Sequence, residues 1–206
     1  ALQSGQVKRE ELWITSKLWN NAHAKKHVRP ALEKTLKDLQ LDYLDLFLIH
    51  WPVHFQPGVL FPKRVEEFLV PDAIPLSETW QAMEALVDKG LCRFIGVCNF
   101  HLGRLQALKQ EAKIQPLMNQ IELHPYLQQV EMLEYCRASN TLLTGYSPLG
   151  SGDRPAALAE LTGILLNDGI KLPNVRFESL HYAQGTPYET IMNKTPDNLA
   201  LSPLTA

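Results

Sequence analysis

The sequence predicts an α/β protein of the (β/α)8 TIM-barrel type, incomplete in this chain, with about five βα units. Five short apolar runs alternate with helix-like stretches, and the runs are almost continuously apolar. Continuous apolar runs are typical of parallel strands buried on both faces, and their alternation with helices indicates right-handed βαβ units. An open doubly wound sheet is the alternative. That fold usually carries a GxGxxG turn, which this chain lacks.

The strands are expected at the five apolar runs. These are residues 12–17, 44–49, 93–97, 117–121 and 142–146. The first helix follows from Val28, Leu32, Leu36 and Leu39, which recur at near-helical spacing, and Pro30 fits its first turn.

Three further helices are expected between the later strands. A long connection, residues 52–75, precedes the second helix, for which Ser77 is the expected N-cap and Gly90 the closing residue. The other two helices are expected over residues 101–112 and 128–138. Residues 1–155 are therefore interpreted as a partial barrel.

The last part of the chain, residues 156–206, is interpreted as a divergent, unassigned tail. Three more βα units in residues 151–206 would have only about 19 residues each, whereas a βαβ unit needs about 30. One helix is expected near residues 155–167. Pro187, Pro196 and Pro203 would interrupt any sheet there.

Composition excludes several classes of protein. The 206 residues carry a net charge of −2, which argues against a nucleic-acid binder. No apolar stretch is long enough for a membrane span, and no signal-peptide pattern is present. The three cysteines, Cys92, Cys98 and Cys136, lack CxxC spacing and are interpreted as reduced thiols of a cytoplasmic protein.

Two histidine pairs have the i, i+4 spacing of possible metal ligands, His23 with His27 and His50 with His54. Neither has a nearby carboxylate or cysteine cluster, so no metal site is expected. His23 is expected in a solvated helix start beside two lysines, and His54 in an exposed loop. Glu84 is expected on the surface of its helix.

Polar or aromatic side chains stand at the carboxyl ends of all five expected strands. They are Lys17, His50, Asn99, Gln120 and Tyr146. Catalytic residues of barrels gather at these ends. A neutral His can donate a hydrogen bond to a carbonyl oxygen, and amides can hold a carboxamide. The set therefore predicts a site for a carbonyl compound and a planar, amide-bearing cofactor such as nicotinamide.

Five segments in order strengthen this interpretation. They are WITSKLW at 13–19, LDYLDLFLIHWP at 41–52, GVCNF at 96–100, NQIELHPYLQ at 119–128 and GYSPLGSGDRP at 145–155. Together they resemble the aldo-keto reductase superfamily. The resemblance implies a barrel oxidoreductase that reduces aldehydes or ketones to alcohols with NADPH, or with NADH, and without metal.

The resemblance also assigns residues. Lys17 and His50 match two catalytic positions, and Trp51 matches a residue of the substrate pocket. The positions that match cofactor contacts are Cys98, which replaces the usual Ser, with Asn99, Gln120, Tyr146, Ser147 and Leu149.

Two family residues are missing from the expected place. The Tyr that gives the proton and the Asp that holds the Lys precede the Lys-bearing strand, but residues 1–16 contain neither Asp nor Tyr. The chain is therefore expected to be truncated and impaired. The alternative is a non-catalytic barrel remnant that binds nucleotide weakly or serves as an interaction surface. Open sheet edges at residues 12–17 and 142–146 predict self-association.

Overall fold

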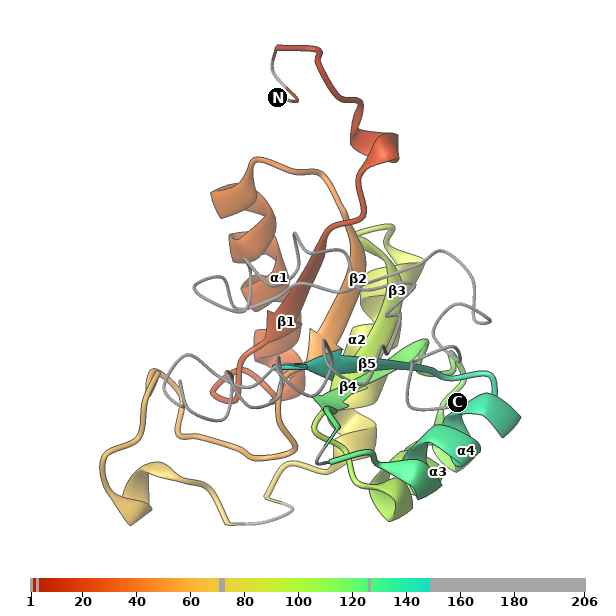
Figure 1. Cartoon of the computed structure of the whole chain (residues 1–206). Helices are drawn as coiled ribbons and strands as arrows, with labels where there is room; N and C mark the ends of the chain where they lie inside the picture. The colour runs from red at the N-terminus through yellow and green to blue at the C-terminus, as the bar shows by residue number, and fades with distance from the viewer. Residues whose placement is uncertain (1, 3, 71–72, 126, 149–206) are drawn as a thin grey trace, which may run out of the picture. The chain divides into compact units, whose positions relative to one another are not determined.

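The computed structural model describes residues 2, 4–70, 73–125 and 127–148. Its five-stranded parallel sheet has the order β1-β2-β3-β4-β5 (Figure 1). The strands are β1 (Thr15–Leu18), β2 (Leu44–Ile49), β3 (Cys92–Cys98), β4 (Met118–Glu122) and β5 (Leu142–Tyr146). The helices are α1 (Lys25–Leu39), α2 (Leu76–Asp88), α3 (Leu102–Glu111) and α4 (Val130–Ala138), with short 3₁₀ turns η1 (Arg9–Glu11) and η2 (Val65–Glu67).

The alternating order confirms the predicted βα pattern of a partial barrel. The first strand begins at Thr15, later than expected, and the other four lie within one residue of their expected bounds. The predicted tail, with its helix near residues 155–167, lies outside the described residues. The proposed boundary at residue 155 stays a prediction.

The chain forms two compact units. Of the described residues, the first contains those up to Val97 and Ala107–Pro116, and the second contains Cys98–Gln106 and those between Leu117 and residue 148. In the first unit, β2 pairs in parallel with β1 and with β3. All six residues of β2 are buried, as its almost continuous apolar run predicts.

Two helices pack in the first unit. Helix α1 contacts β1 and α2 and buries Val28, Leu32 and Leu36. The expected N-cap of α2 is wrong: Pro75 occupies that position, and Ser77 lies inside the helix. Proline fits a helix start because its missing N–H would have no intrahelical acceptor there. Gly90 follows the end of α2 with φ +69°, as expected of a closing glycine.

Glu84 is not a surface residue, contrary to expectation. It is buried on α2, and its Oε1 accepts hydrogen bonds from the N–H groups of Lys113 and Ile114, at 2.8 and 3.0 Å. A buried carboxylate is tolerated when backbone N–H groups satisfy it. Glu84 thus holds the segment that follows α3 against α2.

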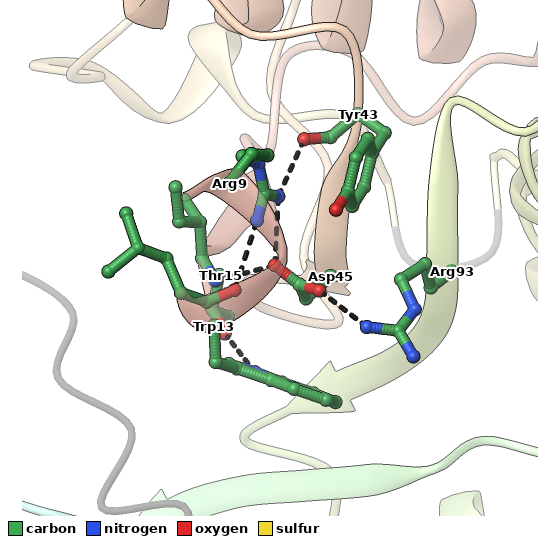
Figure 2. Close-up of polar contacts among 8 residues, drawn as sticks. Arg9, Trp13, Thr15, Tyr43, Asp45 and Arg93 are labelled. Atoms are coloured by element: carbon green, nitrogen blue, oxygen red, sulfur yellow. Dashed lines mark hydrogen bonds and ion pairs between the residues drawn. The ribbon is translucent and has the colours of Figure 1, made fainter. Parts of the chain in front are cut away.

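A buried ionic cluster lies at the amino ends of β2 and β3 (Figure 2). The side chain of Asp45 is 1% exposed and pairs with Arg9 at 2.8 Å and with Arg93 at 3.0 Å. Asp45 also accepts the N–H of Ile14 at 2.9 Å, while Arg9 donates to the carbonyl oxygen of Tyr43 at 2.9 Å. The cluster therefore joins the segment before β1 to β2 and β3.

The second unit contains the β4–β5 pair. Gln120 lies beside Thr144, and Glu122 beside Tyr146, in the parallel ladder. Helix α4 packs on β5 and buries Met132 and Cys136.

Candidate active site

Lys17 and His50 project from one face of the sheet in the first unit. Lys17 pairs with Leu48 in the β1–β2 ladder. His50 stands two residues after Leu48, and residues two apart on an extended chain share a face. The backbone N–H of His50 donates to the carbonyl oxygen of Leu18 at 3.1 Å. This bond fixes the start of the loop that carries the imidazole.

The imidazole of His50 is kept neutral. Burial, and to a smaller extent the positive charge of Lys17, lower its pKa from 6.5 to about 4. A neutral imidazole at pH 7 offers one N–H as a hydrogen-bond donor without giving up a proton. His50 is therefore suited to orient and polarise a carbonyl oxygen.

Aromatic rings surround His50. Trp19 makes an edge contact with the imidazole at a centroid distance of 4.9 Å, and Trp51 stacks near it at 6.3 Å. Trp51 is 40% exposed. Trp19 also contacts Phe61 at 5.8 Å and donates its indole N–H to the carbonyl oxygen of Leu60 at 2.8 Å. These rings form an apolar wall beside the imidazole of His50.

Trp19 was missed as a candidate from the sequence. It stands two residues after Lys17, and the alternation of an extended chain would have placed both on one face. The aromatic contact with His50 depends on the return of the chain at residue 50, so spacing around Lys17 alone could not show it.

The residues expected around a cofactor lie in the second unit. Cys98 ends β3 and is buried. Asn99 follows it with φ 61°, and its N–H donates to the carbonyl oxygen of Gln120 at 2.9 Å. The side chain of Gln120 is buried on β4. One backbone bond therefore brings two of the predicted carboxamide-binding residues together.

Tyr146 and Ser147 stand at the end of β5. Burial raises the pKa of the Tyr146 phenol, and the negative charges of Glu122 and of a Cys98 thiolate act in the same direction. Ser147 adopts φ 50°. Left-handed residues other than glycine are uncommon, and such strain gathers at functional sites. Asn99 and Ser147 both have this feature. Leu149 lies outside the described residues.

A model of the aldo/keto reductase family matches residues 1–157. The chain belongs to the aldo-keto reductase family. An aldo/keto reductase of Synechocystis sp. is 59% identical over 160 residues, which are 78% of this chain and 49% of that protein. Aldo-keto reductase family 1 member A1 of Bos taurus is 50% identical over 149 residues, with coverages of 72% and 46%.

Solved structures of the family share its fold. Aldose reductase from Giardia lamblia is 47% identical with a TM-score of 0.68, and covers 72% of this chain and 49% of its own. The enzyme from Schistosoma japonicum is 44% identical with the same TM-score. This aldo-keto reductase chain thus spans about half the length of the relatives it matches. None of its described helices is long and apolar enough to cross a membrane.

Proposed function

We propose that these residues serve an oxidoreductase that reduces aldehydes or ketones to alcohols with NADPH, NADH being the second possible donor. The observation that carries the proposal is the pair formed by Lys17 and His50. The two residues lie on one face of the sheet, and the imidazole of His50 is neutral. This arrangement suits a carbonyl substrate, because negative charge develops on the carbonyl oxygen during its reduction.

The first unit supplies the groups that face the substrate. His50 donates an N–H to the carbonyl oxygen and orients it. The positive charge of Lys17, already evident in the lowered pKa of His50, favours charge development on that oxygen. Trp19 and Trp51 offer apolar surface to the rest of the substrate. An aromatic aldehyde is therefore the substrate class we propose.

The second unit supplies residues whose chemistry fits a nicotinamide group. The amides of Asn99 and Gln120 each carry both a donor and an acceptor, which match the two halves of a carboxamide. Tyr146 offers a ring face for stacking, and Ser147 and Leu149 match in sequence the family's loop that approaches the pyrophosphate. A bound nicotinamide would supply the hydride. Cys98 is a weak hydrogen-bond partner in a place where the family has Ser.

None of the residues named above is assigned the role of proton donor. Residues 1–16 contain neither Asp nor Tyr, and a reaction without a general acid is typically about 10²–10⁴-fold slower. We therefore expect a polypeptide of these 206 residues, tested alone, to turn over slowly. The alternative function is nucleotide binding without catalysis, which does not need a proton donor.

The test combines cofactor binding with turnover. NADPH binding to the purified 206-residue protein is measured by titration calorimetry, with Gln120→Leu as the variant and the exposed Gln128→Leu as the matched control. We expect Gln120→Leu alone to weaken binding about tenfold, because a buried amide partner of the ligand is lost. Equal binding by both variants would remove Gln120 from the proposed site.

Turnover of an aromatic aldehyde separates the two functions. Slow reduction that Lys17→Met abolishes supports an impaired reductase. Binding without any reduction supports the alternative. Reduction at an ordinary enzymatic rate that depends on Lys17 would show that another residue gives the proton, and would contradict the expected impairment.

Two further proposals concern the surroundings of the protein. The interior holds Cys92, Cys98 and Cys136 as buried thiols, which supports a cytoplasmic location. Strands β1 and β5 end the strand order, and we propose self-association through them. Sedimentation of the purified protein tests it: a monodisperse monomer at all concentrations would contradict the proposal.

A further inference from the structure

Two buried histidines join separate segments of the first unit. His23 lies between β1 and α1, and His54 lies on the long connection between β2 and α2. Their Nδ1 atoms are 2.8 Å apart, and their rings meet edge to face at 87°. His23 is 1% exposed and His54 8%. The expectation that both face solvent is therefore wrong.

The pair works only when its rings are not both charged. One Nδ1 must donate and the other accept, so a proton on each ring would set two N–H groups against each other. The Nε2 atom of His23 is buried and has no hydrogen-bond partner among the described residues. A proton there would create a buried N–H and a buried charge, both of which are costly.

The pair stands where the connection is fastened to the loop after β1. The N–H of Phe55 donates to the carbonyl oxygen of Asn20 at 2.9 Å, directly beside the pair. The N–H of Leu69 donates to the carbonyl oxygen of His54 at 2.9 Å, and Phe55 forms an antiparallel bridge with Phe68. His54 and Phe55 thus pair with Phe68 and Leu69 in a short antiparallel segment that is bonded to Asn20 and His23.

The same connection builds the aromatic wall of the candidate site. Phe55 and Phe61 contact Trp19 at 6.0 and 5.8 Å, and Leu60 accepts its indole N–H. Trp19 in turn contacts His50. Release of His54 from His23 would therefore loosen the wall without removing any residue that faces the carbonyl.

We propose that His23 and His54 are positioning residues. Their neutral hydrogen-bonded pair holds the connection against Trp19 and thereby sets the affinity for the substrate. Protonation at acid pH breaks the pair and releases the connection. The part that concerns substrate rests on the proposed carbonyl reduction. Neither histidine touches substrate in this scheme. The substrate that contacts the aromatic wall is the same aromatic carbonyl compound, and release of the connection should raise its KM.

The groups around His23 favour a neutral ring. On its own loop and helix, Lys25 is the nearest charged residue in sequence, and its N–H donates to Glu78 of α2 at 3.2 Å in an exposed bond. From α2, the neutral Thr79 donates its hydroxyl to the carbonyl oxygen of His23 at 2.9 Å. From the connection comes His54. Burial and then His54 lower the pKa of His23 to about 3.

Hydrogen exchange tests the fastening without any substrate. The amides of Phe55 and Leu69 report on the connection, and the amide of Leu48 in β2 is the internal control. If the opened connection binds one more proton than the closed one, the protection factors of its amides fall about tenfold per pH unit below pH 6.5. We therefore expect a loss of roughly a hundredfold at Phe55 and Leu69 between pH 7.5 and 4.5, after correction for intrinsic rates.

Three variants decide whether the pair causes this loss. His54→Gln keeps an acceptor for His23 but does not titrate, so it should retain protection and reduce the acid step. His23→Phe removes the bond and should give low protection at both pH values. His27→Gln, on α1, is the control and should behave as the unchanged protein. A flat pH profile in the unchanged protein, or the same acid step in all variants, would overturn the proposal.

Kinetics separate this inference from the proposed function. With an aromatic aldehyde, His23→Phe should raise KM about tenfold and leave the Kd for NADPH unchanged. Altered exchange with unchanged KM would overturn the role in substrate affinity. An exchange step in a protein without any carbonyl reduction would refute the proposed function and leave the fastening intact.

Discussion

The ionic cluster around Asp45 offers the sharpest test of what stabilises the first unit. Asp45→Asn keeps the size of the side chain and removes its charge. Three contacts change: the pair with Arg9, the pair with Arg93 and the bond from the N–H of Ile14. The side chain of Arg9 is 18% exposed and that of Arg93 is 53% exposed, so only Arg93 turns readily to water.

The magnitude follows from this difference in burial. A hydrogen bond to a charged group contributes about 1.5–3 kcal/mol, which applies to the contacts with Arg9 and Ile14. The exposed pair with Arg93 contributes less than about 1 kcal/mol. Asn retains one acceptor oxygen. We expect a loss of about 3 kcal/mol in the free energy of unfolding, within the range for a broken buried pair.

Urea unfolding followed by tryptophan fluorescence measures this loss. Trp13 lies beside the cluster (Figure 2) and reports on it; its ring stacks on Phe94 at a centroid distance of 5.6 Å. The midpoint should fall by about 1–3 M, since the slope for small proteins is about 1–3 kcal/mol per M. The matched control is Asp42→Asn, the same change at an exposed position, which should stay within about 0.5 kcal/mol. Equal effects of the two substitutions would refute the reasoning.

Two other predictions concern pH and packing. Burial and then His54 lower the pKa of His23 from 6.5 to about 3. A histidine whose pKa is lowered by folding stabilises the folded state above pH 6.5, the pKa of the unfolded chain, so this contribution should be lost as the pH falls from 6.5 toward 3. The ceiling is about 5 kcal/mol, and His23→Gln should flatten this part of a pH series of urea midpoints. Gly145→Ala sets a Cβ 3.1 Å from the carbonyl oxygen of Leu123 and should lower the free energy of unfolding by about 1–3 kcal/mol. Gly103→Ala, in α3, meets only ordinary contacts and should raise the free energy of unfolding by up to about 1 kcal/mol. Thermal melts compare both, and a destabilised Gly103→Ala with an unchanged Gly145→Ala would contradict the packing argument.

The fold class could be read from local patterns. Residues 44–49 are apolar except for Asp45, and all six are buried in β2. A strand buried on both faces is apolar at nearly every position, so a local run of this kind predicts its burial, although it does not explain the buried Asp45. The same holds for the order of the five motif segments. Lys17 lies near the end of β1 and His50 directly follows β2, and both strand ends could be predicted from the sequence. The pairing of Lys17 with Leu48, two residues before His50, then places the two side chains on one face.

Polar residues gave less reliable predictions. Glu84 has helical spacing typical of a surface residue, yet N–H groups 29 and 30 residues away satisfy it in the interior. His23 follows the same pattern, because His54, 31 residues away, is its partner. Burial of a polar group depends on a distant partner, and a local pattern contains no information about that partner.

The sequence by itself therefore determined the strands, the family and the residues at the strand ends, because apolar periodicity and motif order are local properties of the chain. Only the tertiary structure decided which polar groups are buried. Asp45 meets Arg9 across 36 residues and Arg93 across 48, and His54 reaches His23 because the connection folds back on the loop after β1. The physical reason is that charges and imidazoles enter the interior only where the fold brings their partners to them.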